Sequence, residues 1–172
     1  ARCFAFVGPY LPLDKHFAVG NFIADVIDKR DIEILGDGTP FRSYLYAADL
    51  AIWLWTVLLK GDSGEVYNVG GNNEMQNIQV IETICDLLEV YSPRKSGKEY
   101  KDLIKFVKDR PGHDKRYAID AGKLCSELNW QPTVDFKEGL SKTIDWYLEN
   151  SNWMKNITSG TYKEYYAKQY SR

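Results

Sequence analysis

The succession of apolar and polar positions predicts a chain in which short strands alternate with helices. Short apolar runs bounded by glycine, proline or polar residues predict strands over 2–7, 32–35, 42–46, 65–69 and 105–107. Apolar residues that recur on one helical face predict helices over 14–28, 47–59, 78–90, 121–128 and 135–149, with Asp120 and Asp135 as N-caps. Strands interleaved with helices are typical of the α/β class.

The segment 47–59 is apolar on nearly every side, so we expect a helix that is packed on several sides. Asp49 interrupts the surrounding apolar stretch, which is also too short to span a bilayer. We find no signal peptide and expect no membrane attachment. The first residues read like the interior of a buried strand, which predicts that the chain begins inside a larger fold.

Charge and cysteine content narrow the function classes. The formal net charge is −2, so any anion site must be local, and we expect no nucleic-acid partner. Cys3, Cys85 and Cys125 lie far apart in apolar surroundings and form no CxxC or Cys/His metal spacing. We therefore expect buried free thiols, no metal site and a reducing, cytoplasmic location.

The run DRPGHDKRYAID carries the strongest chemical signal. Arg110, His113, Lys115 and Arg116 surround the pair Pro111-Gly112. Guanidinium groups meet phosphate oxygens two at a time, and a Pro-Gly turn lets the backbone approach an anion. The run indicates a diphosphate site; a solvated charged loop is the alternative.

Five further residues are candidates, each with an ordinary structural alternative. Lys15 and His16 begin a predicted helix and would hold phosphate or ribose there, or are first-turn surface residues. Arg42 follows the turn 36–40 and either reaches a phosphate or is a surface strand residue. Asn77 is a helix cap or a ligand contact, and Tyr170 either binds phosphate or packs. GxSxG, HExxH, Walker and GxGxxG motifs are absent, so we name no catalytic residue.

These phrases together resemble a known family. YNVGGNNEMQN, ETICDLLE, FVKDRPGHDKRYAIDAGKL, ELNWQPTVDFKEGLSKTIDWYLENSNW and SGTYKEYY, all within 67–172, resemble the C-terminal part of the dTDP-glucose 4,6-dehydratases. RCFAFVGPYLPLDKHFAVGNFI and GDGTPFRSYLYAADLA resemble the wider superfamily of extended short-chain dehydrogenases and nucleotide-sugar epimerases.

The resemblance implies an enzyme with an NAD-binding Rossmann domain followed by a smaller domain that holds a nucleotide sugar. Such enzymes oxidise the sugar at C4, eliminate water across C5 and C6, and return the hydride at C6. Residues 1–172 would be a single partial domain that binds a dTDP- or UDP-linked sugar, with 1–9 as a residual Rossmann strand. The glycine fingerprint, the Tyr-xxx-Lys pair and the acid-base carboxylates would all lie upstream. NAD would serve the full-length family, and we expect none to bind this chain alone.

The resemblance also assigns the site. It places Lys15 and His16 at the nucleotide, Glu33, Ile34 and Leu35 around the base, and Arg42 on the diphosphate. Asn77, Arg110 and His113 complete the nucleotide site, Asp109, Pro111 and Gly112 shape its loop, and Tyr170 touches the phosphates. One departure matters, because the family's SNNY segment is replaced by Phe4-Ala5-Phe6-Val7, which removes its asparagine contacts.

Three hypotheses follow. The chain is the substrate-binding portion of a nucleotide-sugar dehydratase or related epimerase that is inactive alone, a binding module without catalysis, or a remnant with only an interaction role. In each case we expect self-association or association with an N-terminal domain, because both would cover exposed apolar surface.

Overall fold

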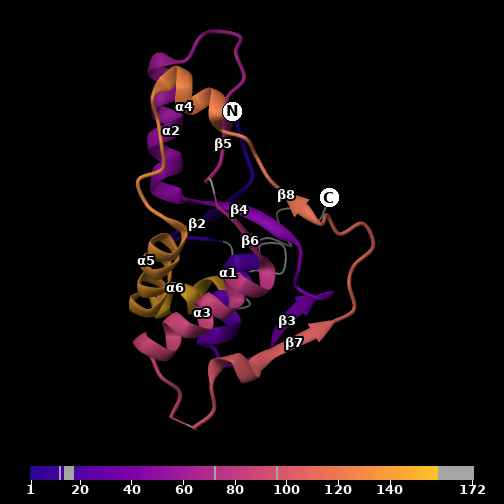
Figure 1. Cartoon of the computed structure of the whole chain (residues 1–172). Coiled ribbons are helices and arrows are strands. Elements are labelled where there is room, and N and C mark those ends of the chain that lie inside the picture. The colour runs from indigo at the N-terminus through magenta and orange to yellow at the C-terminus, as the bar shows by residue number, and fades with distance from the viewer. Residues whose placement is uncertain (12, 14–17, 72, 96, 159–172) are drawn as a thin grey trace, which may run out of the picture.

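The computed structural model describes residues 1–11, 13, 18–71, 73–95 and 97–158. It confirms the α/β class (Figure 1). The strands are β1 (Arg2–Cys3), β2 (Ala5–Val7), β3 (Ile32–Leu35), β4 (Phe41–Tyr46), β5 (Asn68–Val69), β6 (Glu74–Gln76), β7 (Ile104–Val107) and β8 (Arg116–Tyr117). The helices are α1 (Ala18–Ile27), α2 (Ala47–Lys60), α3 (Asn77–Tyr91), α4 (Gly122–Leu128), α5 (Phe136–Glu149) and α6 (Ser151–Thr158), and η1 (Tyr100–Leu103) is a 3-10 turn.

Strand β4 organises the sheet structure. Its residues 44–46 pair with β2 in parallel, while residues 41–43 lie between antiparallel β6 and parallel β8. Arg42 is opposite Met75 on one neighbour and Tyr117 on the other. Because directly opposite residues share a face of the sheet, these three side chains lie together.

Two hydrophobic clusters meet at β4. The larger cluster packs α1, α3 and α5 against β2, β3 and β4, with Ile23, Ile84 and Ile144 fully buried. The smaller cluster gathers around Trp53 of α2 and includes residues of β5 and α4. Tyr44 belongs to the larger cluster and Leu45 to the smaller, because consecutive strand residues point to opposite faces. Figure 1 accordingly shows α2 and α4 at one end, away from α1, α3 and α5.

Strands β3 and β7 form a separate parallel pair in which Leu35 is opposite Val107. Parallel strands end at the same edge, so the turn 36–40 and the loop 108–115 begin next to each other. A hydrogen bond from Gly36 N to Val107 O (3.0 Å) closes that edge. This pairing brings two segments that are far apart in sequence into one site.

Most predicted elements are confirmed with shifted ends. The strand expected over 2–7 is wrong as one unit, because the chain breaks at Phe4 and β1 pairs with β5 while β2 pairs with β4. Asp135 caps α5 as predicted, accepting from Glu138 N at 2.8 Å. The predicted Asp120 cap is wrong, because α4 begins one residue later than expected and its N-cap is Ala121, although Asp120 does accept from Gly122 N at 2.7 Å.

Helix α2 forms as predicted, but its expected packing on several sides is wrong. Only Asp49 and Trp53 of this helix are buried. Ile52, Trp55 and Leu58 are exposed, Trp55 by 63% and Leu58 by 72%. An amphipathic stripe is enough to seat α2 on the smaller cluster, so the remaining apolar side chains form an uncovered face.

The three cysteines are free, as predicted, but they are not equally buried. Cys85 is buried in α3, and desolvation raises the pKa of its thiol to about 12. Cys3 on β1 is exposed, which corrects the expectation that every thiol is buried. Within the described residues, no helix combines the length and apolar character needed to cross a membrane.

Asp49 connects α2 to the turn that precedes α5. Its carboxylate is 1% exposed and accepts hydrogen bonds from Thr133 N (3.0 Å), Thr133 Oγ1 (2.7 Å) and Val134 N (3.0 Å). The charge that interrupts the apolar stretch is therefore a buried acceptor for the turn that precedes α5. This contact ties α2 to a segment more than eighty residues away.

We expect Asp49→Ala to lower the free energy of unfolding by about 3 kcal/mol, because it leaves buried N–H groups without an acceptor. Urea unfolding followed by circular dichroism measures the loss. The matched control is Asp31→Ala, at an exposed aspartate, which should change stability by less than about 0.5 kcal/mol. Equal stability of the two variants would show that Asp49 does not hold the turn.

Candidate functional site

Two glycine turns shape the candidate site. Gly36 has a φ of +71°, and a Cβ there would stand 3.0 Å from Asp109 Oδ2, so the turn 36–40 abuts the loop 108–115. Gly112 has a φ of +69° in the Pro111-Gly112 turn. A positive φ after proline is the requirement of a type II turn. The predicted role of Pro111 and Gly112 in shaping this loop is consistent with that geometry.

Arg42 is held on three sides. Its Nη1 donates to Phe41 O (2.7 Å), and its Nη2 lies 3.1 Å from His113 Nε2. Its guanidinium also stacks on the Tyr117 ring, 4.5 Å from the centroid. Restraint by neighbours on β4, β8 and the loop lowers the conformational entropy that Arg42 would lose on binding an anion.

His113 is the bridge between Arg42 and an acid. Its side chain is only 6% exposed, and its Nδ1 lies 2.7 Å from Asp109 Oδ1. The same Asp109 oxygen accepts from Arg110 N at 2.8 Å. The structure therefore brings Arg42, Asp109 and His113 together in one hydrogen-bonded set.

Tyr117 lies beneath Arg42 and was not among the sequence candidates. Its hydroxyl donates to Asp114, and that hydrogen bond and the negative charge of Asp114 raise the pKa of Tyr117. The positive charges of Arg42 and Arg110 oppose this shift. Only the pairing of β8 with β4 brings Tyr117 to Arg42, and no sequence motif carries that register.

The cations of the DRPGHDKRYAID run do not act alike. Arg110 is exposed and forms no ion pair within the described part of the chain, so it is available to a ligand. Arg116 instead binds Glu74 through Nε (2.7 Å) and Nη2 (2.6 Å). Arg116 is opposite Phe41 in the sheet and so lies on the other face from Arg42. Its expected part in the cation cluster is wrong.

Asn77 stands at the start of α3, next to the turn 36–40. Its backbone N donates to Pro40 O (3.0 Å), and Ile78 N donates to Gly38 O (3.0 Å). The helix cap is Gln76, with Gln79 as its reciprocal partner, so the cap reading of Asn77 is wrong. Its side chain is buried (8% exposed), and within the described residues its Oδ1 has no hydrogen-bond partner. That acceptor is therefore buried and unsatisfied within the described residues.

The predicted base-contacting residues cannot all present side chains to one pocket. In β3, Ile34 points into the core (1% exposed), while Glu33 and Leu35 are exposed on the other face. This alternation follows from the two-residue period of a strand. Lys15, His16 and Tyr170 lie outside the described residues.

The segment that departs from the family pattern reaches the same site. The ring of Phe4 lies 5.8 Å from that of Tyr117, between centroids. Phe4, Tyr117 and Arg42 therefore lie in one row at the edge of the candidate site, with the two rings tilted by 45°. An aromatic side chain here favours stacking over the amide hydrogen bonds of the family's asparagines.

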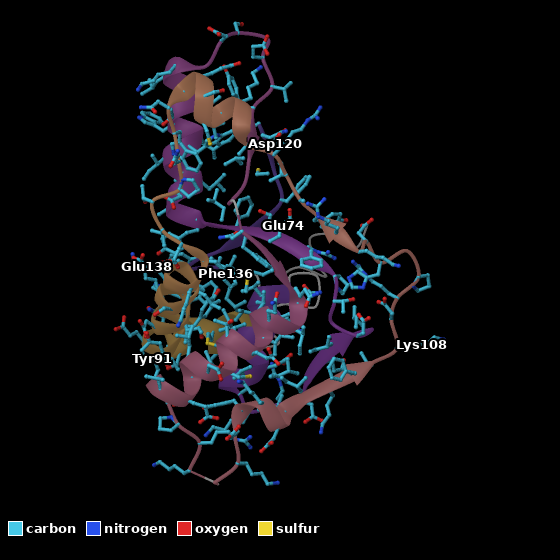
Figure 2. The ribbon with its side chains drawn as sticks, viewed as in Figure 1. Glu74, Tyr91, Lys108, Asp120, Phe136 and Glu138 are labelled. Carbon is cyan, nitrogen blue, oxygen red and sulfur yellow. The ribbon has the colours of Figure 1, made fainter. Side chains whose placement is uncertain are left out.

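One Tyr-xxx-Lys spacing occurs in this chain, at Tyr91 and Lys95, and the structure places it away from the site. Tyr91 ends α3, and its hydroxyl lies 2.6 Å from Ser141 Oγ. Asn77 begins the same helix, about 21 Å away at 1.5 Å per residue. Figure 2 shows Tyr91 on the opposite side of the molecule from Lys108, where the site loop begins.

Two strand-to-helix junctions of this chain lack the turn that a dinucleotide cofactor needs. The diphosphate of such a cofactor lies in a glycine-rich turn between a strand and a helix. Here β4 runs directly into α2 and β6 directly into α3, with no glycine at either junction. The described residues also contain no cluster of three or more His, Cys, Asp or Glu side chains suited to a metal ion.

Comparison with known proteins defines the class. The dTDP-glucose 4,6-dehydratase of Bacillus anthracis, solved with NAD, superposes with a TM-score of 0.79 at 37% identity over 91% of this chain and 46% of that one. The dTDP-glucose 4,6-dehydratase of Streptomyces venezuelae, with NAD and TYD bound, gives 0.80 at 31% identity, over 91% of this chain and 45% of that one. The fold is that of the extended short-chain dehydrogenases, of which this chain corresponds to less than half.

Sequence comparison gives the family. Residues 1–143 match the family described as GDP-mannose 4,6 dehydratase, and the chain belongs to it. The dTDP-glucose 4,6-dehydratase of Shigella flexneri is 44% identical over 163 residues, which cover 95% of this chain and 44% of that protein. The chain thus spans less than half the length of the curated relatives it matches.

Proposed function

We propose that this chain is the nucleotide-sugar-binding portion of an NAD-dependent 4,6-dehydratase that acts on a dTDP- or UDP-linked sugar. The observation that carries the proposal is the set of Arg42, Asp109 and His113, with Arg110 exposed beside it. A restrained guanidinium on Arg42 and an exposed one on Arg110, in the loop that carries Asp109 and His113, suit the two phosphates of a nucleoside diphosphate. The dTDP-glucose dehydratases named above support the thymidine nucleotide.

Binding residues are assigned by their place in this set. Arg42 and Arg110 clamp the diphosphate, and the buried, unsatisfied Oδ1 of Asn77 accepts from the nucleotide or sugar once a ligand group reaches it. The backbone of Glu33, Ile34 and Leu35 ends at the same edge and would meet a base there, while Lys15, His16 and Tyr170 stay predictions. A related nucleotide-sugar epimerase is the alternative, and the described residues contain no catalytic group that separates the two.

We expect Arg42→Ala and Arg110→Ala each to weaken dTDP binding by roughly ten- to a hundredfold, since a hydrogen bond to a charged group contributes about 1.5–3 kcal/mol. Isothermal titration calorimetry of the whole chain measures this. Arg116→Ala is the matched control, because Arg116 is held by Glu74 on the other face and should leave binding unchanged.

The same titration tests the base. We expect dTDP and UDP to bind more tightly than GDP, because the dTDP-glucose dehydratases named above indicate a pyrimidine and a purine base is larger. Unchanged dTDP binding in both arginine variants would place the site elsewhere. Tighter GDP binding would overturn the pyrimidine assignment and leave the diphosphate clamp.

Catalysis requires groups that the described residues do not assemble. The chain contains no dinucleotide fingerprint, and Tyr91 and Lys95 lie at the far end of α3 from Asn77. We expect the purified chain to form no 4-keto-6-deoxy sugar from dTDP-glucose with NAD supplied. The Shigella flexneri relative serves as the positive control. Turnover that scales with chain concentration and disappears in Arg42→Ala would contradict the expectation.

The exposed apolar surface of α2 and the β1–β5 pair supports an NAD-binding N-terminal half as the partner. Strands β1 and β5 form a two-stranded parallel sheet, and parallel sheets are normally buried on both faces. Ile52, Trp55 and Leu58 are exposed on α2, which packs on the same smaller cluster as β5. The relatives carry more than half of their length outside the matched region. A Rossmann half, on the same polypeptide or a separate one, would extend the sheet at β1 and cover α2.

We expect the N-terminal half of the Shigella flexneri dehydratase to bind this chain and to slow alkylation of Cys3, which lies exposed on β1. Mass spectrometry after timed alkylation measures the protection. Trp55→Glu should abolish the association by placing a charge in the covered face. Val90→Glu, at an exposed apolar side chain of α3 away from this face, is the matched control. Unaltered Cys3 alkylation in the mixture would refute the docking surface.

A further inference from the structure

Asp109 and Arg42 approach opposite nitrogens of the same imidazole. Asp109 Oδ1 lies 2.7 Å from His113 Nδ1, and Arg42 Nη2 lies 3.1 Å from His113 Nε2. A guanidinium has only donors, and an ionised carboxylate has only acceptors. Both contacts are therefore satisfied at once only when the neutral imidazole carries its proton on Nδ1. In the other tautomer, Nε2–H would face a donor and the Nδ1 lone pair would face the carboxylate.

We propose that Asp109 is a positioning residue that sets the tautomer of His113, so that His113 Nε2 holds the Arg42 guanidinium ready for the diphosphate. This inference rests on the proposed function for the ligand, but the tautomer itself is a property of the free chain. Asp109 does not touch the ligand in this scheme. It acts through His113.

The surroundings of Asp109 support this role. Its Oδ1 also accepts from Arg110 N (2.8 Å), and its Oδ2 faces Gly36. The same carboxylate therefore orders the backbone that carries Arg110 and the imidazole that holds Arg42, and it lies against the turn 36–40. His113 is nearly enclosed, so water has little access to replace either partner.

Arg42 is then directed by contacts that leave part of it free. Nη1 donates to Phe41 O, Nη2 to His113, and one face of the guanidinium rests on Tyr117. Its remaining N–H groups are available to phosphate oxygens. A side chain that is already held in its bound orientation loses less entropy on binding. The Asp109–His113–Arg42 contacts therefore strengthen affinity without a new ligand contact.

Charge alone predicts the opposite effect of removing Asp109. Asp109 is an anion beside a site proposed for an anionic ligand, so simple electrostatics predicts that its loss would strengthen binding. A positioning role predicts weaker binding. The sign of the change in affinity therefore separates the two explanations.

The first test needs no variant. Nitrogen-15 NMR of histidine-labelled chain above neutral pH, without ligand, reports which imidazole nitrogen carries the proton. The chain has two histidines, so a His16→Gln chain assigns His113. We expect His113 in the Nδ1–H form. An Nε2–H form, or an equal mixture of the two, would overturn the proposal whether or not dTDP binds.

The second test measures how Asp109 affects dTDP binding. Asp109→Ala should lose the single tautomer and weaken dTDP binding about five- to twentyfold, and Asp109→Asn, whose amide oxygen still accepts from Nδ1–H, should recover part of both. Asp31→Ala controls for the loss of one negative charge. Equal or tighter dTDP binding by Asp109→Ala would refute the positioning role. Failure of the unaltered chain to bind dTDP would instead count against the proposed function.

Discussion

The pairing of β4 on both sides is the constraint on which the rest of the structure depends. This six-residue strand contacts β2 along one half, and β6 and β8 along the other. A strand with neighbours at both edges satisfies its backbone hydrogen bonds and cannot slip by one residue without exchanging its faces. Tyr44 consequently packs in the larger hydrophobic cluster and Leu45 in the smaller one. Arg42, on the same strand, inherits that rigidity.

The site illustrates how a few polar contacts turn a charged loop into a defined geometry. The run from Asp109 to Asp120 is mostly exposed and carries both charges, which in isolation favours a solvated loop. Pairing of β3 with β7 delivers it to the turn 36–40, and His113 then becomes enclosed between Asp109 and Arg42. Interactions among exposed ions contribute little, whereas a nearly buried imidazole with one partner on each nitrogen has a single favourable arrangement.

The two ends of the molecule differ in how fully their apolar side chains are covered. The larger cluster surrounds its buried side chains with three helices and several strands. Around the smaller cluster, much of α2 and the pair β1–β5 is exposed, although Asp49 holds the turn before α5 by hydrogen bonds. The difference matches the comparisons, in which this chain covers less than half of each relative.

The sequence by itself determined the α/β class, most of the helices and the Asp135 cap, and it selected Arg42, Asp109, Arg110 and His113 as candidate site residues. These depend on local signals, such as apolar periodicity, turn residues and a specific family motif. Only the tertiary structure decided that Arg116 serves Glu74, that Tyr117 and Phe4 reach Arg42, and that the apolar side chains of α2 are largely uncovered. Those outcomes depend on strand register and on which surfaces meet, and neither quantity is encoded in any short segment of the chain.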